Sequence, residues 1–455
     1  MREVRIHDTL SGEPRVLESR DPPKVGIYAC GPTVYAPIHV GNARPFVVFA
    51  LLKRFLEHEG RQVTLVENVT DVNDKIYDAA RERGVPSAEL ARDMTAAYVE
   101  ATDRLGLGRP DREPKASQTI DDIVDLIGSL IEGGHAYEAN GDVYFRVGSF
   151  KDYGKLSNRP LEEMYQGEGD DAAELKEAPQ DFALWKARKE GEDTWWDAPW
   201  GQGRPGWHIE CSAMAEVILG LDFEVHGGGS DLVFPHHENE IAQTEAARGK
   251  PLARVWMHNG MVEMDAEKMA KSVGNIRLLH VALDQFGRDA ILMWLVGAHY
   301  RKPLAFSEEA LTDAVRAVQR VRDFVRRLDP DAPAPEGLDD FVERFFDALA
   351  DDFNTPAARA VLFDWIAEGN RRMDGGEVLG PGRLGEMLYA LGLEDLLEDT
   401  GEEAPDAVRR LADEREAART ARDFARADRI REELAEQGWE VRDTPGGAQL
   451  VPKRA

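Results

Sequence analysis

The order of apolar and polar positions in the first 70 residues predicts a strand, a helix and a second strand. Lys24–Ala29 is a short apolar stretch broken by Cys30-Gly31-Pro32, as expected of a buried strand. Apolar side chains recur at helical spacing over residues 46–56, and Gln62–Val66 is brief and rich in β-branched residues. A βαβ unit of this kind implies a parallel sheet with a right-handed crossover.

The loops that follow these two strands are where we expect polar chemistry, because ligands of parallel sheets bind at the carboxyl ends of the strands. Cys30 and His39 lie in the first of these loops, and Thr70 follows the second strand. Asn42 is a candidate N-cap for the intervening helix, with Pro45 in its first turn.

The middle of the chain changes character twice. Residues 75–135 have a mainly helical pattern, whereas residues 136–205 combine short strands, polar loops and several tryptophans, which is typical of an insertion into a sheet domain. We expect the sheet to resume with Gly206–Cys211, a glycine-rich stretch and Arg254–His258.

The last third of the chain is predicted to be helical. Beyond Ala305 the helical pattern reaches the low 390s, interrupted by an Asp/Pro/Ala linker at Asp329–Glu336. An acidic linker at Glu398–Asp406 precedes what we predict to be one long helix. Its arginines recur every three or four residues and are Arg415, Arg419, Arg422, Arg426 and Arg429. Such a stripe is either a solvated face with acidic partners or a contact for a phosphate backbone.

Composition restricts the class of protein. A chain of 455 residues is too long for one compact core, so we expect two to four domains. Two cysteines make no disulfide framework, which favours a reducing compartment, and neither a membrane span nor an apolar signal region is evident. The net charge of −29 argues against a nucleic-acid partner only weakly, since binding depends on where the basic residues cluster.

His236 and Glu240 form the first candidate metal-binding pair. They lie four residues apart in a segment predicted to be helical from Pro235 onward, so their side chains share one face. A pair at this spacing is more often a surface or capping pair, and two ligands make a poor metal site. If Cys30 and Cys211, the two cysteines of the sequence, converge on it, the resulting set of two thiols, an imidazole and a carboxylate favours zinc.

Two short motifs have the character of phosphate-binding segments. His39-Val40-Gly41-Asn42 lies between predicted strand and helix, where free N–H groups at the helix N-terminus favour anions. Lys268-Met269-Ala270-Lys271-Ser272 places two lysines beside a serine, which suits the neutralisation of a departing pyrophosphate. Alone, the first is a weak four-residue pattern, and the second is equally typical of an exposed lysine loop.

The order of the motifs is more specific than any one of them. HxGN after the first strand and KMxKS about 230 residues later resemble the two ATP signatures of class I aminoacyl-tRNA synthetases. Four further segments are similar to the cysteinyl-tRNA synthetase family, and these are Cys30–Tyr35, Gly41–Pro45, Gly206–Met214 and Gly227–Glu240. The resemblance extends from about residue 5 to the C-terminal segment.

This resemblance implies roles for individual residues. The zinc ligands would be Cys30, Cys211, His236 and Glu240, and the cysteine pocket would include Thr70, Trp207 and Asp231. The residues implied in ATP binding and catalysis are Pro32, Thr33, His39, Gly41, Asn42, Lys268, Met269, Lys271 and Ser272, with Lys271 as a phosphate contact. The family's second signature histidine is Asn42 here and a signature serine is Ala270, and we expect neither to abolish activity.

The implied architecture is α/β. A Rossmann-like parallel-sheet catalytic domain, residues 1–135 and 206–305, is split by a connective insertion at 136–205. An α-helical bundle at 306–397 and a small anticodon-binding domain at 398–455 follow. The resemblance further implies a cytoplasmic monomer that uses ATP with Mg²⁺ to activate L-cysteine as cysteinyl adenylate and transfers it to the 3′ adenosine of tRNA(Cys). No separate editing domain is expected, because a zinc-bound thiolate distinguishes cysteine from serine.

Two other classes of protein share parts of this pattern. The cysteine:amino-sugar ligase of mycothiol biosynthesis would carry similar zinc and ATP motifs but needs no tRNA. The C-terminal segments Asp351–Pro356, Gly438–Arg442 and Gly446–Leu450 resemble the helical-bundle and anticodon modules of the synthetase and favour the tRNA enzyme. A non-catalytic paralogue would be expected to lose His39 or Lys271, and both are present.

Overall fold

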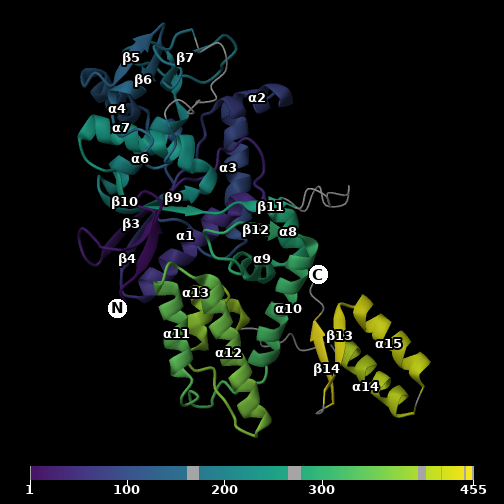
Figure 1. Ribbon diagram of the computed structural model, residues 1–455. Helices are drawn as coiled ribbons and strands as arrows, with labels where there is room; N and C mark the ends of the chain where they lie inside the picture. The colour runs from purple at the N-terminus through teal and green to yellow at the C-terminus, as the bar shows by residue number, and fades with distance from the viewer. Residues whose placement is uncertain are drawn as a thin grey trace.

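The structure is a computed structural model of the chain. It describes residues 2–160, 174–264, 278–397, 406–421, 423–444 and 447–452. Figure 1 shows a central sheet with a smaller sheet above it, a group of helices below it, and a C-terminal module of two helices and a hairpin. None of the helices in the described ranges is long and apolar enough to cross a membrane.

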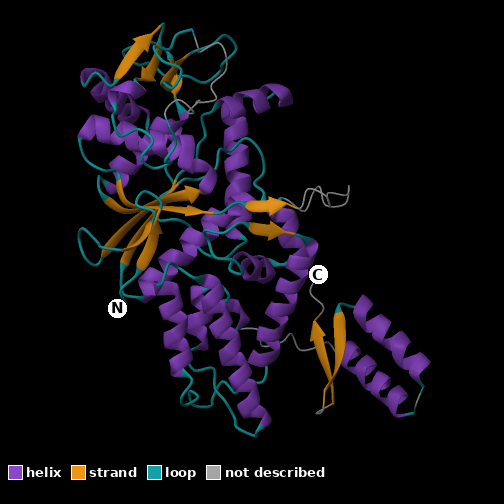
Figure 2. Ribbon diagram, in the orientation of Figure 1, coloured by secondary structure: helices purple, strands orange, loops and turns teal. Residues whose placement is uncertain are grey.

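The central sheet has four strands in the order β10-β9-β3-β4, and all neighbours are parallel (Figure 2). The strands are β3 (Lys24–Ala29), β4 (Gln62–Glu67), β9 (Phe223–Gly229) and β10 (Ala253–Asn259). Helix α1 (Val40–His58) connects β3 to β4. The predicted βαβ unit and parallel sheet are therefore confirmed. A short antiparallel hairpin, β1 (Arg5–Asp8) and β2 (Glu13–Val16), precedes it.

Helix α1 begins earlier than predicted. Its N-cap is His39, whose ring accepts hydrogen bonds from the N–H groups of Gly41 and Asn42, while the Asn42 side chain accepts one from the His39 N–H. The prediction of Asn42 as N-cap is wrong, because the histidine ring takes the capping role usually given to Ser, Thr, Asp or Asn. Pro45 consequently lies inside the helix rather than in its first turn.

Residues 74–132 are mainly helical, as predicted. They form α2 (Asp74–Arg83), α3 (Ser87–Asp103), the turn η1 (Ala116–Gln118) and α4 (Ile120–Glu132). A second, antiparallel sheet in the order β5-β6-β7-β8 follows, which confirms the short strands expected there. Its strands are β5 (Ala136–Ala139), β6 (Asp142–Phe145), β7 (Phe182–Ala187) and β8 (Gly203–Pro205), with η2 (Val147–Ser149) after β6.

The segment expected to resume the central sheet is instead a helix, α6 (Trp207–Leu219). Ile209 and Ala213 on it pack into the core of the antiparallel sheet, whereas Cys211 and Met214 pack into a second apolar cluster beside β9. A helix buried on opposite faces carries no polar stripe, so the periodicity that identifies a surface helix is missing.

The chain returns to the central sheet through β9 and leaves it again after a second helix. Short turns η4 (Ser230–Leu232) and η5 (Val233–His237) lead into α7 (Glu238–Arg248), and β10 follows. Beyond it, β11 (Val262–Met264) pairs in parallel with β12 (Leu304–Phe306). The helices α8 (Leu279–Phe286) and α9 (Arg288–Leu295) lie between these strands in the sequence.

A group of helices packs against the lower end of α1 (Figure 1). Phe55 of α1 stacks on Phe346 of α11 with their ring centroids 6.5 Å apart. The helices are α10 (Glu308–Val325), α11 (Asp339–Ala350), α12 (Thr355–Asp374) and α13 (Leu384–Ala390), followed by η6 (Glu394–Leu396). The linker predicted at 329–336 lies between α10 and α11, as expected.

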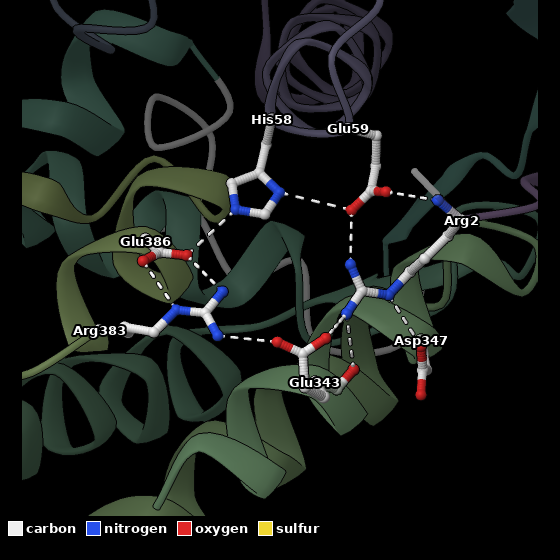
Figure 3. A network of polar contacts seen from close by, with 7 residues as sticks. All are labelled: Arg2, His58, Glu59, Glu343, Asp347, Arg383 and Glu386. Carbon is white, nitrogen blue, oxygen red and sulfur yellow. Dashed lines mark hydrogen bonds and ion pairs between the residues drawn. The ribbon is translucent and has the colours of Figure 1, made fainter. Parts of the chain in front are cut away.

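A network of charged side chains ties the end of α1 and the N-terminal segment to these helices (Figure 3). Its members are Arg2, His58, Glu59, Glu343, Asp347, Arg383 and Glu386. Arg2 donates to Glu59 over 2.7 Å and to Asp347 over 2.8 Å. Burial opposes ionisation of Glu59, but the hydrogen bonds and charge of Arg2 outweigh it and lower the pKa of Glu59. This network helps to hold α1 against the helices below the sheet.

The C-terminal module contains two helices where one was predicted. These are α14 (Asp406–Thr420) and α15 (Phe424–Glu436), and the hairpin β13 (Trp439–Thr444) and β14 (Gly447–Pro452) follows. Asp423 caps α15 by accepting from the Arg426 N–H, which starts a new helix. The predicted arginine stripe is not continuous, because Arg415 is buried and Arg426 pairs with Glu414 across the two helices. Arg422 lies outside the described residues.

Candidate active site

The four predicted zinc ligands converge at the carboxyl end of the parallel sheet. Cys30 follows β3, Cys211 lies on α6, His236 lies in η5, and Glu240 lies in the first turn of α7. One ligand atom from each lies within 4.8 Å of all the others, and all four side chains are buried. The two sulfur atoms are 3.8 Å apart, Cys30 Sγ lies 3.7 Å from Glu240 Oε1, and His236 Nε2 lies 3.1 Å from the same oxygen.

These separations suit a tetrahedral metal centre. Metal–ligand bonds of about 2.0–2.3 Å place neighbouring tetrahedral ligands about 3.3–3.8 Å apart. Two thiols, one imidazole and one carboxylate also match the donor types that zinc takes in proteins. The residues present therefore fit a zinc ion.

The glycine run before α7 allows the close approach of chain segments around this site. A Cβ atom on Gly227 would lie 2.3 Å from the Phe49 ring and 2.5 Å from the Met257 carbonyl oxygen. The Gly227 carbonyl accepts the N–H of Cys30 over 2.9 Å, which fixes the backbone of the first ligand. The absence of side chains here is thus a packing requirement.

A shell of histidines surrounds the four ligands and was not identified from the sequence. His226 Nε2 lies 2.7 Å from the second Glu240 oxygen, and His208 Nδ1 lies 3.0 Å from His236 Nδ1. His237 contacts the Cys30 sulfur at 3.3 Å, and its other nitrogen lies 2.7 Å from His258. Such outer contacts orient metal ligands. Cys30, His226, His237 and Glu240 form a second group whose atoms meet the same 4.8 Å limit.

Burial favours the neutral forms of Cys30, His236 and Glu240 when no metal is bound. Desolvation, with the neighbouring Cys211 and Glu240, raises the pKa of Cys30 well above its usual value. Desolvation likewise raises the pKa of Glu240 and, together with His208 and His226, lowers the pKa of His236. A divalent cation reverses this preference for the thiol and the carboxyl, because it favours the deprotonated donors.

The three residues expected in the cysteine pocket lie at the rim of this site or in the adjoining loops. The Trp207 ring stacks on His236 with centroids 4.3 Å apart. Thr70 is fully buried and its backbone pairs with the loop after β3, accepting from Val34 N–H over 3.1 Å. Asp231 is exposed and follows the glycine run.

The first ATP signature forms the exposed N-terminus of α1. His39 and Asn42 are exposed, and each side chain caps the backbone of the other. Pro32 and Thr33 lie in the loop that pairs with Thr70, where Thr70 N–H donates to the Pro32 carbonyl over 3.2 Å. The second signature, with Lys268, Met269, Lys271 and Ser272, lies outside the described residues.

Comparison with known proteins agrees with this geometry. Residues 16–316 match the family described as tRNA synthetases class I (C) catalytic domain. The chain is 44% identical to a cysteine–tRNA ligase of Brevibacillus brevis, over 98% of this chain and 99% of that one. It is 45% identical to a cysteine–tRNA ligase of Halorhodospira halophila, over 98% of this chain and 99% of the relative. The chain belongs to the cysteine–tRNA ligase family.

Members of this family are aminoacyl-tRNA synthetases of class I, and the predicted fold class is confirmed by the solved structures that resemble the chain. The methionyl-tRNA synthetase of Mycobacterium tuberculosis with methionyl-adenylate superimposes with a TM-score of 0.58 at 16% identity, covering 82% of this chain and 88% of that one. An arginyl-tRNA synthetase of Campylobacter jejuni gives a TM-score of 0.54 at 14% identity, covering 84% and 92%. Residues 344–392, in the helices below the sheet, match the DALR domain family.

Proposed function

We propose that this enzyme joins L-cysteine to tRNA(Cys) in two steps. In the first, the cysteine carboxylate attacks the α-phosphorus of ATP, the bond to the β-phosphate oxygen breaks, and cysteinyl adenylate and pyrophosphate form. In the second, a hydroxyl of the terminal adenosine of tRNA attacks the acyl carbon, and AMP leaves. No protein nucleophile is required, so the protein supplies alignment and charge stabilisation.

The observation that carries this proposal is the buried set of Cys30, Cys211, His236 and Glu240 at the end of the parallel sheet. A zinc ion bound there would take the thiolate of substrate cysteine as an added ligand and would favour it over the serine hydroxyl. Trp207, stacked on His236, would form one wall of the amino-acid pocket. Thr70 and Asp231 would complete the pocket from the neighbouring loops.

The ATP site is proposed at the N-terminus of α1. His39, Gly41 and Asn42 would meet the phosphates there, where the helix dipole and the N–H groups favour anions. Pro32 and Thr33 lie in the loop that leads into this helix. The roles of Lys268, Met269, Lys271 and Ser272, and the accompanying Mg²⁺, rest on the resemblance of the sequence to the family.

The tRNA partner is supported by the extent of the similarity. The alignments with cysteine–tRNA ligases span 98% of the chain and therefore include α14, α15 and much of the C-terminal hairpin. These elements have an apolar core of their own, made by residues such as Ile430, Leu434 and Trp439. We propose that this module, within residues 398–455, contacts the anticodon. An amino-sugar ligase would have no use for it.

The test is transfer of labelled cysteine to bulk tRNA by the purified protein with ATP and Mg²⁺, with labelled serine as the control. We expect charging with cysteine and none with serine. Cysteine-dependent pyrophosphate exchange without charging of tRNA would instead favour the cysteine:amino-sugar ligase. Absence of both activities would contradict the proposal.

A further inference from the structure

Arg44, on helix α1, has a buried guanidinium group. The hydrogen bonds that this group makes within the described residues all go to backbone carbonyls. The Arg44 side chain is 1% exposed. Nη1 donates to Gly260 over 2.5 Å and to Met261 over 3.1 Å, whereas Nη2 donates to His299 over 3.2 Å and to Lys302 over 2.7 Å. Among the described residues no carboxylate pairs with it, and its Nε atom has no partner. Within the described ranges, the groups that face the guanidinium charge at hydrogen-bond distance are therefore peptide carbonyls.

Arg54, on the same helix, shows how a structural arginine is accommodated in this protein. It is 8% exposed and donates to the Glu394 carboxylate over 2.7 Å, as well as to carbonyls of Tyr389 and Gly106. Desolvation lowers the pKa of Arg44 to about 10, so it remains charged at neutral pH. Burying a charge without a partner ion is costly, which indicates that the charge of Arg44 serves more than packing.

The carbonyls that Arg44 holds belong to two segments that pack tightly together. Gly260 and Met261 form the corner between β10 and β11, and His299–Lys302 leads into β12. The Gly260 N–H donates to the Tyr300 carbonyl over 2.7 Å, and a Cβ atom on Gly260 would lie 2.4 Å from the Lys302 carbonyl oxygen. The planar guanidinium bridges both segments, which a single ammonium group cannot do with the same geometry.

Arg44 also lies close to the phosphate-binding end of α1. It is five residues after His39, or roughly 7 Å along the helix axis at 1.5 Å per residue. The first turn packs against the same corner, since a Cβ atom on Gly41 would lie 3.7 Å from the Cβ of Val262 in β11. The position of His39, Gly41 and Asn42 relative to the sheet therefore depends on the contacts between α1 and this corner.

We propose that Arg44 is a positioning residue for adenylate formation. It fixes the first turn of α1 against the β10–β11 corner, and it places a positive charge behind the helix N-terminus where the phosphates of ATP would bind. This inference rests on the function proposed above. It assigns Arg44 a role in the rate of the ATP step, and none in the affinity for cysteine or for zinc.

The experiment measures cysteine-dependent ATP–pyrophosphate exchange, zinc content and thermal stability for Arg44→Met, Arg44→Lys and the matched control Arg54→Met. We expect Arg44→Met to lower kcat about 100-fold. Arg44→Lys should lower it about 10-fold, because lysine keeps the positive charge but lacks the planar guanidinium that reaches both segments. The KM for cysteine and the zinc content should stay within about threefold. Arg54→Met should lower Tm but leave kcat within about threefold.

A purely structural role would give a different result. If kcat of the folded Arg44 variants equals that of the unsubstituted protein, or falls no further than in Arg54→Met, the inference is wrong. If Arg44→Met does not fold, Arg44→Lys decides in the same way, with a tenfold loss of kcat at unchanged KM for cysteine supporting the role. If the unsubstituted protein shows no exchange with cysteine, the proposed function itself fails, and the role of Arg44 fails with it.

Discussion

The sulfur atoms of Cys30 and Cys211 lie 3.8 Å apart although the two residues are 181 positions apart in the sequence. One follows the first strand of the parallel sheet, and the other lies on a helix that begins after the antiparallel sheet. Their meeting at the carboxyl end of β3 and β9 brings two thiols to His236 and Glu240. The candidate metal site can therefore form only when the chain from β3 to α7 is folded.

Loss of one of these sulfurs should impair both metal binding and substrate affinity. In Cys211→Ser, a hydroxyl replaces a thiolate ligand, so we expect zinc content to fall at least tenfold and the KM for cysteine to rise at least tenfold. Zinc is measured by metal analysis after dialysis, and KM by pyrophosphate exchange. Ser212→Ala, at the adjacent buried position, is the control and should keep its zinc. Full zinc and an unchanged KM in Cys211→Ser would contradict the proposed selection of the thiolate.

The histidine shell should control how tightly the metal is held. His226 Nε2 lies 2.7 Å from Glu240 Oε2, so His226→Gln should loosen the orientation of this carboxylate and weaken zinc binding about 10- to 100-fold. Competition with a chromogenic chelator measures the affinity. His135→Gln is a suitable control, because His135 contacts Ser149 in another part of the molecule. Equal affinities in the two variants would rule out a role for His226 at the metal.

The candidate ligands could be predicted from the sequence because their spacing and motifs are visible in it. The surrounding histidines could not, because only their contacts in the folded protein bring them to the site. His236 and Glu240 are four residues apart, and the two cysteines were the obvious candidates to join them. His208, His226 and His258 stand singly in the sequence, so no pattern shows that they surround the ligands. Their arrangement depends on the strand order, which places β9 between β10 and β3.

Some elements of the fold could likewise be predicted from the sequence, and others could not. The β3–α1–β4 unit follows from apolar periodicity, whereas α6 escaped detection because apolar neighbours cover opposite faces of it. The break between α14 and α15 had a signal in the sequence, since Asp423 is a good N-cap residue. The recurrence of arginines across it outweighed that signal and led to the prediction of a single helix.

Gly41 should tolerate no side chain if the first turn of α1 binds phosphate. A Cβ atom there would lie 2.9 Å from Nδ1 and Cε1 of the His39 ring, so Gly41→Ala should displace this ring from the N–H groups that it caps. We expect kcat for pyrophosphate exchange to fall at least tenfold, with an unchanged KM for cysteine. Gly128→Ala in α4, where a Cβ atom has open space, should keep full activity. Full activity in Gly41→Ala would show that the position of the His39 ring does not matter.

Glu67, at the end of β4, is a buried carboxyl whose ionisation opposes folding. Burial raises the pKa of Glu67 to about 7, although the Tyr98 hydroxyl donates to it and favours the charged form. An unfolded glutamate ionises near pH 4.3. The contribution of neutral Glu67 to the free energy of unfolding is therefore largest below about pH 4.3. It decreases as the pH rises from there to about 7, and it is lost at higher pH.

Glu67→Gln should remove this pH dependence. At pH 8 the loss of the buried charge would stabilise the protein by about 4 kcal/mol, and an unpaired amide would offset about 1 kcal/mol of it. Near pH 4.5 the substitution should be neutral or slightly destabilising, because the native carboxyl is already protonated there. Urea denaturation at both pH values measures the difference, with Glu82→Gln on the exposed face of α2 as the control. An equal effect of Glu67→Gln at pH 4.5 and pH 8 would mean that Glu67 ionises in the folded protein at its ordinary pH.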